Sequence, residues 1–211
     1  MAHTTINKHT AHFNTKLYTG TGSENAITGV GFQPDWVWIK ERNNTTSHRS
    51  FDAIRGATYE VFPDLADDHS ADAQSLKSFD SDGFTLGTDG ATNGSSDTYA
   101  SWNWKGGGSN TSVSASGSGN NCINACTHRA NTTAGFSIVK YTGRSDELSN
   151  GQHTKVTHGL GVKPSFYIIK QLGSKNWVVM LSGYNDKHVH LNTTDVADGG
   201  LFTGNTNNSD A

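Results

Sequence analysis

The stretch Gly31-Phe-Gln-Pro34-Asp-Trp36-Val-Trp38-Ile-Lys40 decides the fold class. Its first half is typical of a turn that enters a strand, because Pro34 has a fixed φ and cannot donate a hydrogen bond to a ladder. The four residues that begin at Trp36 are all apolar. We therefore expect a strand that is buried on both faces or lies at an interface.

The same pattern recurs later in the chain as Gly161-Val-Lys-Pro164-Ser-Phe166-Tyr-Ile168-Ile-Lys170. Upstream of the two stretches, residues 13–20 and 136–143 share a Phe and a Tyr-Thr-Gly at the same offset. The connection between the two blocks is about seven residues longer in the second copy, which is typical of a surface-loop insertion. Self-similarity of this kind predicts a duplicated β unit.

Further apolar or alternating runs predict more strands and few helices. The additional strands are expected at residues 49–55, 79–87, 99–105, 177–180 and 187–191, and a short helix is expected only within residues 63–77. The abundance of Gly, Thr and Asn suits short strands joined by turns. We expect an all-β fold of two related antiparallel β-sandwich-like repeats, of jelly-roll or lectin-like kind, with the second repeat shorter.

The Gly/Ser/Asn-rich segment after Lys105 separates the two copies, and its composition is typical of an irregular linker. The predicted organisation is an N-terminal arm (residues 1–12), a first β-sandwich repeat (13–105), a linker (106–129) and a second, truncated β repeat (130–211). The arm is a candidate tether that becomes ordered on docking.

The second copy ends on Leu201-Phe-Thr-Gly204 and a polar tail, without a counterpart to the aromatic strand expected at 99–105. A missing strand leaves an open ladder edge, and such edges recruit partners. Either a neighbouring subunit adds a strand, or the short copy packs on the first as a smaller sheet. In both cases we expect a homo-oligomer, with a closed dimer or trimer as the default.

The composition of the chain argues against some classes of binding partner. Hydrophobic residues make up 33% of the chain, charged residues 17%, and the net charge is -3. The 16 Lys and Arg are scattered, which argues against nucleic acid. No run approaches the roughly 18 apolar residues of a membrane span, and residues 1–10 lack a secretory apolar stretch, so we expect synthesis in a cytosol.

Five blocks together resemble a β-rich domain family of marine and cyanobacterial tailed phages. They are Phe-x-Thr-x-Leu-Tyr-Thr-Gly, Gly-Phe-Gln-Pro-Asp-Trp-Val-Trp-Ile-Lys, Ser-Phe-x-Ser-Asp-Gly-Phe-Thr-Leu-Gly, Trp-Asn-Trp-Lys and Ala-Gly-Phe-Ser-Ile-Val-x-Tyr-Thr-Gly. The resemblance covers most of the chain. Members of the family are described as tail-fibre-like, as lectin/glucanase-like sandwiches, or as uncharacterised virion proteins, and no catalytic residues accompany the resemblance.

The resemblance implies a non-enzymatic structural protein of the virion, assembled in the cytoplasm of the host bacterium. Two forms are expected, capsid decoration and a tail-fibre component, and each would stabilise the particle through contacts with other virion proteins. The alternative is a lectin-like module that binds host-surface glycans.

The sequence contains only partial sets of metal ligands. Cys122, Cys126 and His128 resemble part of a zinc site, but a structural site needs four ligands, so two free thiols are favoured. His188 and His190 would place both rings on one face of a strand, where surface or interface histidines are favoured over a metal pair. We expect no metal and no cofactor.

Asp80-Ser-Asp82-Gly83 begins like a calcium loop, but Ala91 occupies the twelfth position, where a bidentate acid is needed. A β-turn is the better prediction.

A glycosidase would need two carboxyls about 5–5.5 Å apart in a cleft for retaining chemistry. The acids considered are Asp35, Glu41, Asp52 and Glu60, and their spacing places no two of them on one face of one strand. We therefore expect no enzyme and no catalytic residue.

Tryptophan offers the remaining site candidates, which are Trp36, Trp38, Trp102, Trp104 and Trp177. Exposed indoles could stack on the apolar faces of sugars, or the same rings could fill the core. Alternating Trp pairs on strands favour the core, because burial of one aromatic removes about 150–250 Å² from water.

Overall fold

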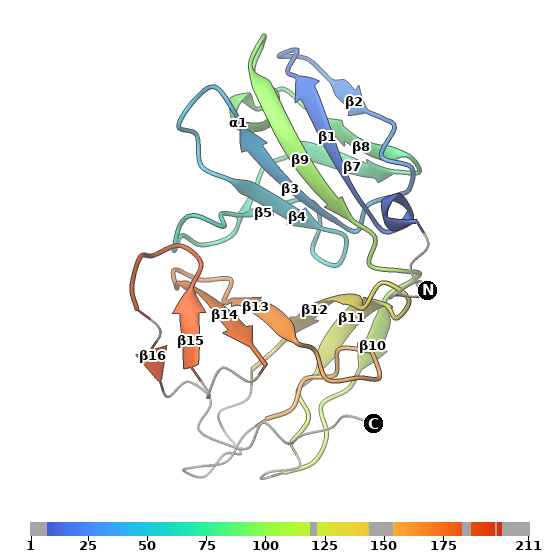
Figure 1. Ribbon diagram of the computed structural model, residues 1–211, viewed down its shortest axis with the longest axis vertical. Coiled ribbons are helices and arrows are strands. Elements are labelled where there is room, and N and C mark those ends of the chain that lie inside the picture. The colour runs from blue at the N-terminus through green and yellow to red at the C-terminus, as the bar shows by residue number, and fades with distance from the viewer. Residues whose placement is uncertain (1–7, 119–121, 144–153, 183–186, 197, 200–211) are drawn as a thin grey trace.

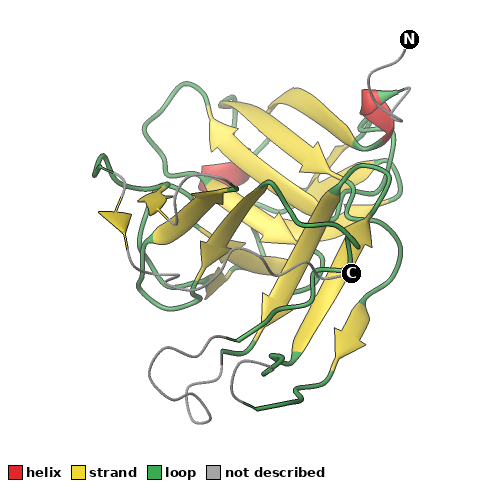
Figure 2. Ribbon diagram, turned by 60° about the horizontal axis from the view of Figure 1, so that its bottom comes forward, coloured by secondary structure: helices red, strands yellow, loops and turns green. Residues whose placement is uncertain are grey.

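The chain forms an almost entirely β structure in a computed structural model that describes residues 8–118, 122–143, 154–182, 187–196 and 198–199. The first unit contains β1 (Phe13–Thr19), β2 (Asn25–Ile27), β3 (Trp36–Glu41), β4 (Arg49–Asp52), β5 (Gly56–Val61), β6 (Ser70–Ala71), β7 (Leu76–Asp80), β8 (Gly83–Leu86) and β9 (Thr98–Trp104). The second unit contains β10 (Thr111–Val113), β11 (Cys126–Asn131), β12 (Phe136–Tyr141), β13 (Phe166–Lys170), β14 (Trp177–Leu181), β15 (Lys187–His190) and β16 (Asp198–Gly199). Among the described residues, the helical segments are a 3-10 turn (His9–Ala11) and α1 (Gly90–Asn93), as Figure 2 shows. The expected all-β class is confirmed.

The first unit is a sandwich of two antiparallel sheets. Its larger sheet has the order β1-β9-β3-β4-β5-β6, and its smaller sheet has the order β2-β8-β7. In Figure 1 the smaller sheet lies behind the larger one. The space between them holds the buried cluster Ile27, Val37, Ile39, Phe51, Leu76, Phe84, Leu86 and Tyr99.

The central strands β3 and β9 turn their tryptophans away from this core. In β3, Val37 and Ile39 are fully buried whereas Trp36 and Trp38 are partly exposed. In β9 the buried residues are Tyr99, Ser101 and Asn103, and the partly exposed ones alternate with them. The expectation that the tryptophans fill the core is therefore wrong for these two strands.

The hydrogen bonds of the Tyr99 hydroxyl explain which alternate side chains of β9 point into the core. The hydroxyl donates to the carbonyl of Gly90 (2.7 Å) and accepts from the amide of Gly94 (2.8 Å), both at α1 on the core side. Side chains alternate along a strand, so fixing Tyr99 inward also turns Ser101 and Asn103 inward. The buried amide of Asn103 donates to the carbonyl of Asn14 (3.1 Å) and to Ser101 Oγ (3.1 Å), which offsets part of the cost of burying it.

The second unit contains two smaller sheets, β10-β11-β12 and β13-β14-β15-β16. It docks on the first unit through contacts between distant segments. The indole of Trp177 donates to the carbonyl of Phe62 (2.7 Å), and Arg129 of β11 pairs with Asp35 just before β3. Figure 1 shows the two units one above the other.

Several local features recur at the positions that the duplication predicts. Lys40 at the end of β3 donates to the carbonyls of Glu41 and Asn44, and Lys170 at the end of β13 donates to three carbonyls of its own following loop. In the turns that precede these strands, the glycine pairs Gly29/Gly31 and Gly159/Gly161 all have positive φ. These parallels support the duplication, which stays a prediction.

Other expectations change. The segment 63–77 contains no helix and instead carries β6 and the start of β7. Two strands, β10 and the beginning of β11, lie within the segment expected to be an irregular linker. The ending Leu201–Gly204, the tail after it and residues 1–7 of the arm lie outside the described residues. In the described part of the chain, no helix is long and apolar enough to cross a membrane.

Candidate functional site

The outer face of the larger sheet carries a continuous row of aromatic rings, here called the aromatic face. Its members are Phe13, Trp36, Trp38, Trp102, Trp104 and Phe136, and each is partly exposed. Trp36 stacks on Trp104 across the β3–β9 ladder with ring centroids 4.3 Å apart. Trp38 meets Trp102 edge to face at 6.3 Å. Five of these rings come from β1, β3 and β9, and Phe136 comes from β12 of the second unit, stacked 5.9 Å from Trp36.

Polar groups of β4 and the loop before it fix the orientation of two of these indoles. The Trp36 indole donates to Ser50 Oγ (2.6 Å), and the Trp38 indole donates to His48 Nδ1 (2.8 Å). Asp52 lies directly opposite Trp36 in the ladder and is paired with Arg55. The aromatic face therefore has a polar margin of hydroxyl, imidazole and carboxylate groups.

His48 is neutral in this arrangement, because Nδ1 must be unprotonated to accept from an indole. Burial lowers the pKa of His48 below its usual value, and the charge of Lys40 acts in the same direction. Asp64 opposes the shift by raising the pKa.

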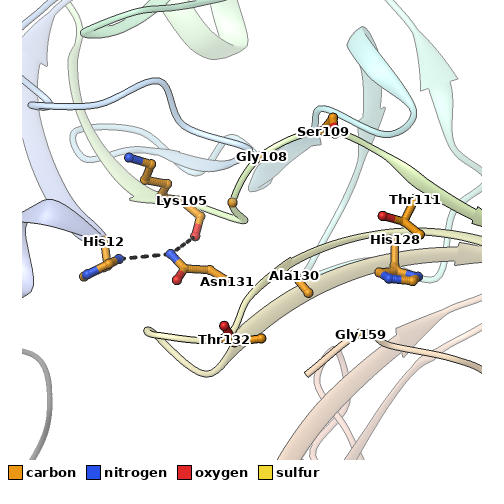
Figure 3. A pocket seen from close by; sticks show the side chains of 11 residues that line it. His12, Lys105, Gly108, Ser109, Thr111, His128, Ala130, Asn131, Thr132 and Gly159 are labelled. Atoms are coloured by element: carbon orange, nitrogen blue, oxygen red, sulfur yellow. Dashed lines mark hydrogen bonds between the residues drawn. The ribbon is translucent and has the colours of Figure 1, made fainter. Parts of the chain in front are cut away.

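A polar pocket adjoins the aromatic face at the junction of the two units, here called the junction pocket. It has a volume of about 450 Å³, and its polar side chains include His12, Lys105, Ser109, Thr111, Asn131 and Thr132. Figure 3 shows the Asn131 amide between the His12 ring and the main chain of Lys105. That amide nitrogen lies 2.9 Å from His12 Nδ1 and donates to the Lys105 carbonyl at 3.1 Å.

A second hollow of about 290 Å³ links the pocket to the aromatic rings. It shares His12 with the junction pocket and is also lined by Phe13, Trp104 and Phe136. The second hollow, which is lined mainly by aromatic rings, is thus a neighbour of the polar junction pocket, and the two share the imidazole of His12.

Two glycines shape the junction pocket. Gly159 has φ +73°, and a Cβ there would lie 2.5 Å from the ring of His128. Gly107 has φ +78°, and a Cβ there would lie 2.7 Å from the carbonyl oxygen of Ala130. Burial lowers the pKa of His128, and the nearby His158 lowers it further.

The four acids considered for catalysis are each held by a partner. Asp35 pairs with Arg129 and also accepts from the amide of Gly106 (2.7 Å). Asp52 pairs with Arg55. The other two are buried as well: Glu41 accepts from Asn44 and Thr46, and Glu60 lies 3.3 Å from Arg49 and accepts from Ser70. The structure gives all four a role in holding the fold.

The metal candidates do not converge. Cys122 and Cys126 are buried free thiols, and burial raises the pKa of Cys126. His188 and His190 do face each other, with ring centroids 5.2 Å apart, but His188 is buried rather than on the surface. Within the described ranges, no three His, Cys, Asp or Glu side chains gather in a way that could hold a metal ion.

The expected turn at residues 80–83 is confirmed between β7 and β8. The carboxylate of Asp82 accepts from the amides of Gly29 (2.9 Å) and Gly31 (2.6 Å). These two bonds lower the pKa of Asp82 below its usual value.

The structure brings together four of the five tryptophans that the sequence proposed as ligand contacts. The fifth, Trp177, is buried at the junction of the units and lies apart from the aromatic face. Sequence reasoning missed Phe13 and Phe136 as members of the face and missed the polar margin of His48 and Ser50. In the sequence the two phenylalanines are recognisable only as markers of the repeat, and their shared position is the available signal.

Comparison with known proteins gave one finding. A family model described as a domain of unknown function, DUF7483, matches residues 8–211. Neither the curated proteins nor the solved structures gave a match. The match spans nearly the whole chain, and the protein therefore belongs to the DUF7483 family.

Proposed function

We propose that this protein is a non-enzymatic glycan-binding module of a tailed-phage particle and that the aromatic face is its binding surface. The observation that carries the proposal is the outward orientation of Trp36, Trp38, Trp102 and Trp104 on one sheet face. These rings are intermediate in burial rather than fully exposed, and their grouping on one sheet face is what supports a partner-binding role. The location in a virion rests on the family resemblance of the sequence.

The chemistry of the face fits a sugar. Pyranose rings with equatorial hydroxyls have flat C–H faces that stack on indoles and edges that form hydrogen bonds. Trp36 and Trp38 already have partners for their N–H groups, and Trp36 also stacks on Trp104 and Phe136, so a ligand would meet only the parts of these rings that the neighbouring rings leave open. The hydroxyls of a bound sugar would meet His48, which is the partly exposed member of the polar margin, or the junction pocket, because Ser50 and Asp52 are buried.

The test is calorimetric titration of the full chain with cellohexaose and with chitohexaose, two oligosaccharides that expose such flat faces. Trp102→Ala is expected to weaken binding at least about tenfold, which is 1.4 kcal/mol, within the range of lost aromatic contacts. Leu17→Ala is the matched control, because Leu17 is 65% exposed on the same sheet and lies opposite Ala100. It should leave the affinity unchanged.

Stability separates loss of a ligand contact from loss of the fold. Ile39→Ala empties a fully buried site and should lower the free energy of unfolding by about 2–5 kcal/mol, whereas Trp102→Ala should cost less. Absence of binding to either oligosaccharide, or equal binding by Trp102→Ala and the parent protein, would count against the proposal.

A second candidate is a purely architectural role, as capsid decoration or a tail-fibre component. The exposed apolar residues Phe166 and Leu181 of the second unit favour it, because burying them between subunits would contribute about 25 cal/mol per Å². This role predicts a dimer or trimer in sedimentation and stable association with other virion proteins in labelled whole particles. A monomer that is absent from particles would exclude it.

A further inference from the structure

We infer that the junction pocket binds the carboxylate of an acidic sugar, so that the glycans recognised by this protein contain hexuronic acid units. The inference rests on the proposed function, because the aromatic face would stack the sugar rings while the pocket beside it binds their charged group. It names the class of glycan that the aromatic face alone leaves open.

The junction pocket has the size and the position for such a contact. Its volume of about 450 Å³ lies within the range of about 300–1,000 Å³ that is usual for ligand pockets. The second hollow meets it at His12 and is lined by Phe13, Trp104 and Phe136 of the aromatic face. In a hexuronic acid the carboxylate is attached to the ring itself, so a sugar stacked on these aromatic rings would bring a carboxylate close to the pocket.

The described residues that line the pocket offer hydrogen-bond donors and include no Asp or Glu. Their polar side chains are those of His12, Lys105, Ser109, Thr111, His128, Asn131 and Thr132. This lining differs from the chain as a whole, in which 19 acidic residues outnumber 16 basic ones. The carboxylate of Asp35, which accepts from the amide of Gly106, is paired with Arg129. The lining therefore suits an anionic group.

Asn131 fixes the hydrogen-bonding role of His12. Its side-chain oxygen accepts from the amide of Ala134 (3.0 Å), so its NH₂ group is the one that faces His12 Nδ1 at 2.9 Å. Nδ1 of His12 is therefore an acceptor, the ring is neutral, and Nε2 carries the proton. Since His12 lines both hollows, this N–H is the donor that the imidazole can offer to a ligand there.

Lys105 supplies a full positive charge to the lining. Its amide donates to the carbonyl of His12 (2.8 Å), so the two side chains leave the main chain at adjoining positions. The Lys105 side chain is exposed, whereas burial lowers the pKa of His128 and favours its neutral form. An ammonium, an imidazole N–H and hydroxyls together suit a carboxylate, because charge-assisted hydrogen bonds are about twice as strong as neutral ones.

The test compares two hexasaccharides that differ only at C6. One is cellohexaose, and the other is β-1,4-linked hexaglucuronate, in which each C6 hydroxymethyl group is a carboxylate. In calorimetric titration of the full chain at about 0.1 M salt, the acidic sugar should bind at least about tenfold more tightly. At about 1 M salt this difference should shrink, because the Debye length falls from about 10 Å to about 3 Å.

Substitutions at Gly108 test whether the contact lies in the pocket. Gly108 lines the pocket with φ +56°, a conformation that Asn and Asp tolerate better than other side chains, and nothing lies within 4 Å of a Cβ there. Gly108→Asp adds a carboxylate to the lining and should remove the preference for the acidic sugar. Gly108→Asn is its uncharged match and should keep the preference. Both variants should bind cellohexaose as the parent protein does.

Lys105→Gln should weaken hexaglucuronate binding about threefold and leave cellohexaose binding unchanged, because it removes one exposed positive charge. Lys140→Gln is the control, because Lys140 is an exposed lysine of β12 that does not line the pocket. Trp102→Ala should weaken the binding of both sugars alike, since Trp102 belongs to the aromatic face and not to the pocket.

Binding of both sugars with equal affinity would overturn the inference and leave the proposed function standing. A preference for hexaglucuronate that survives Gly108→Asp, or that Lys105→Gln and Lys140→Gln reduce equally, would also overturn it, because the charge would then be bound outside the junction pocket. If neither sugar binds, the inference falls together with the proposed function.

Discussion

Trp38 and His48 show how one hydrogen bond couples an exposed aromatic ring to pH. The indole can donate to His48 Nδ1 only while that nitrogen carries no proton. Burial lowers the pKa of His48, so the folded protein holds the ring neutral more strongly than the unfolded chain does. The charge of Lys40, two residues after Trp38 on β3, lowers the pKa of His48 further, and the charge of Asp64 raises it.

We expect stability and the Trp38 contact to weaken together as pH falls below about 6.5. In that range the unfolded chain binds a proton that the folded state resists, so stability rises with pH until both states are neutral. The measurement is the indole N–H signal of Trp38 as a function of pH, together with thermal unfolding at about pH 7.5 and about pH 5. His48→Gln keeps an acceptor that does not titrate, and it should remove the pH dependence of that signal. A midpoint above 6.5 would contradict the assignment.

At the scale of the element, the strands with a clear apolar pattern were predictable, but which of their faces points into the core was not. Alternation in Tyr99 to Trp104 gave the strand β9 correctly. In an alternating strand either set of alternate side chains can point into the core. Which set does so depends on which face of the strand meets the second sheet. That choice is set by the hydroxyl of Tyr99 at α1, a tertiary contact that composition does not reveal. The short strands β2, β6, β10 and β16 also escaped prediction, because they are too brief to show a period. The six-residue strands β5 and β11 escaped it as well, because their sequences show no apolar alternation.

The β7–β8 turn gives a stability prediction at this scale. Gly83 has φ +154°, and a Cβ there would overlap the carbonyl oxygen of Ile27. Gly83→Ala should therefore lower the free energy of unfolding by more than about 1 kcal/mol. Gly90→Ala is the control, since nothing lies within 4 Å of its Cβ position and an alanine in a helix gains up to about 1 kcal/mol over glycine. Urea unfolding of both variants measures the difference, and equal midpoints would refute the steric argument.

At the scale of the whole molecule, the junction of the two units was beyond sequence reasoning. The contact between His12 and Asn131 spans 119 positions, and the pair of Asp35 and Arg129 spans 94. Each of these two contacts joins segments that are far apart in the sequence, and a local sequence pattern carries no information about such a contact. The repeat signal identified Phe136 as a strand marker, but only docking of the units adds its ring to the aromatic face.

The pair of Asp35 and Arg129 should hold the units together. The side chains are only 7% and 18% exposed, so Arg129→Ala would leave a buried carboxylate without its cation. The expected loss is on the order of 3 kcal/mol in the free energy of unfolding, measured by urea titration. Lys140→Ala, at an exposed position of β12, should change it by less than about 0.5 kcal/mol. Equal effects of the two substitutions would show that the pair does not stabilise the junction.

Glycan binding by the aromatic face is tested most directly by the five indole N–H signals in a heteronuclear NMR spectrum during titration with chitohexaose or cellohexaose. At least two signals from Trp36, Trp38, Trp102 and Trp104 should shift with saturation, because those rings line the proposed surface. The signal of Trp177, buried against the carbonyl of Phe62, should stay in place. Five unmoved signals with both sugars, or a shift confined to Trp177, would contradict the account.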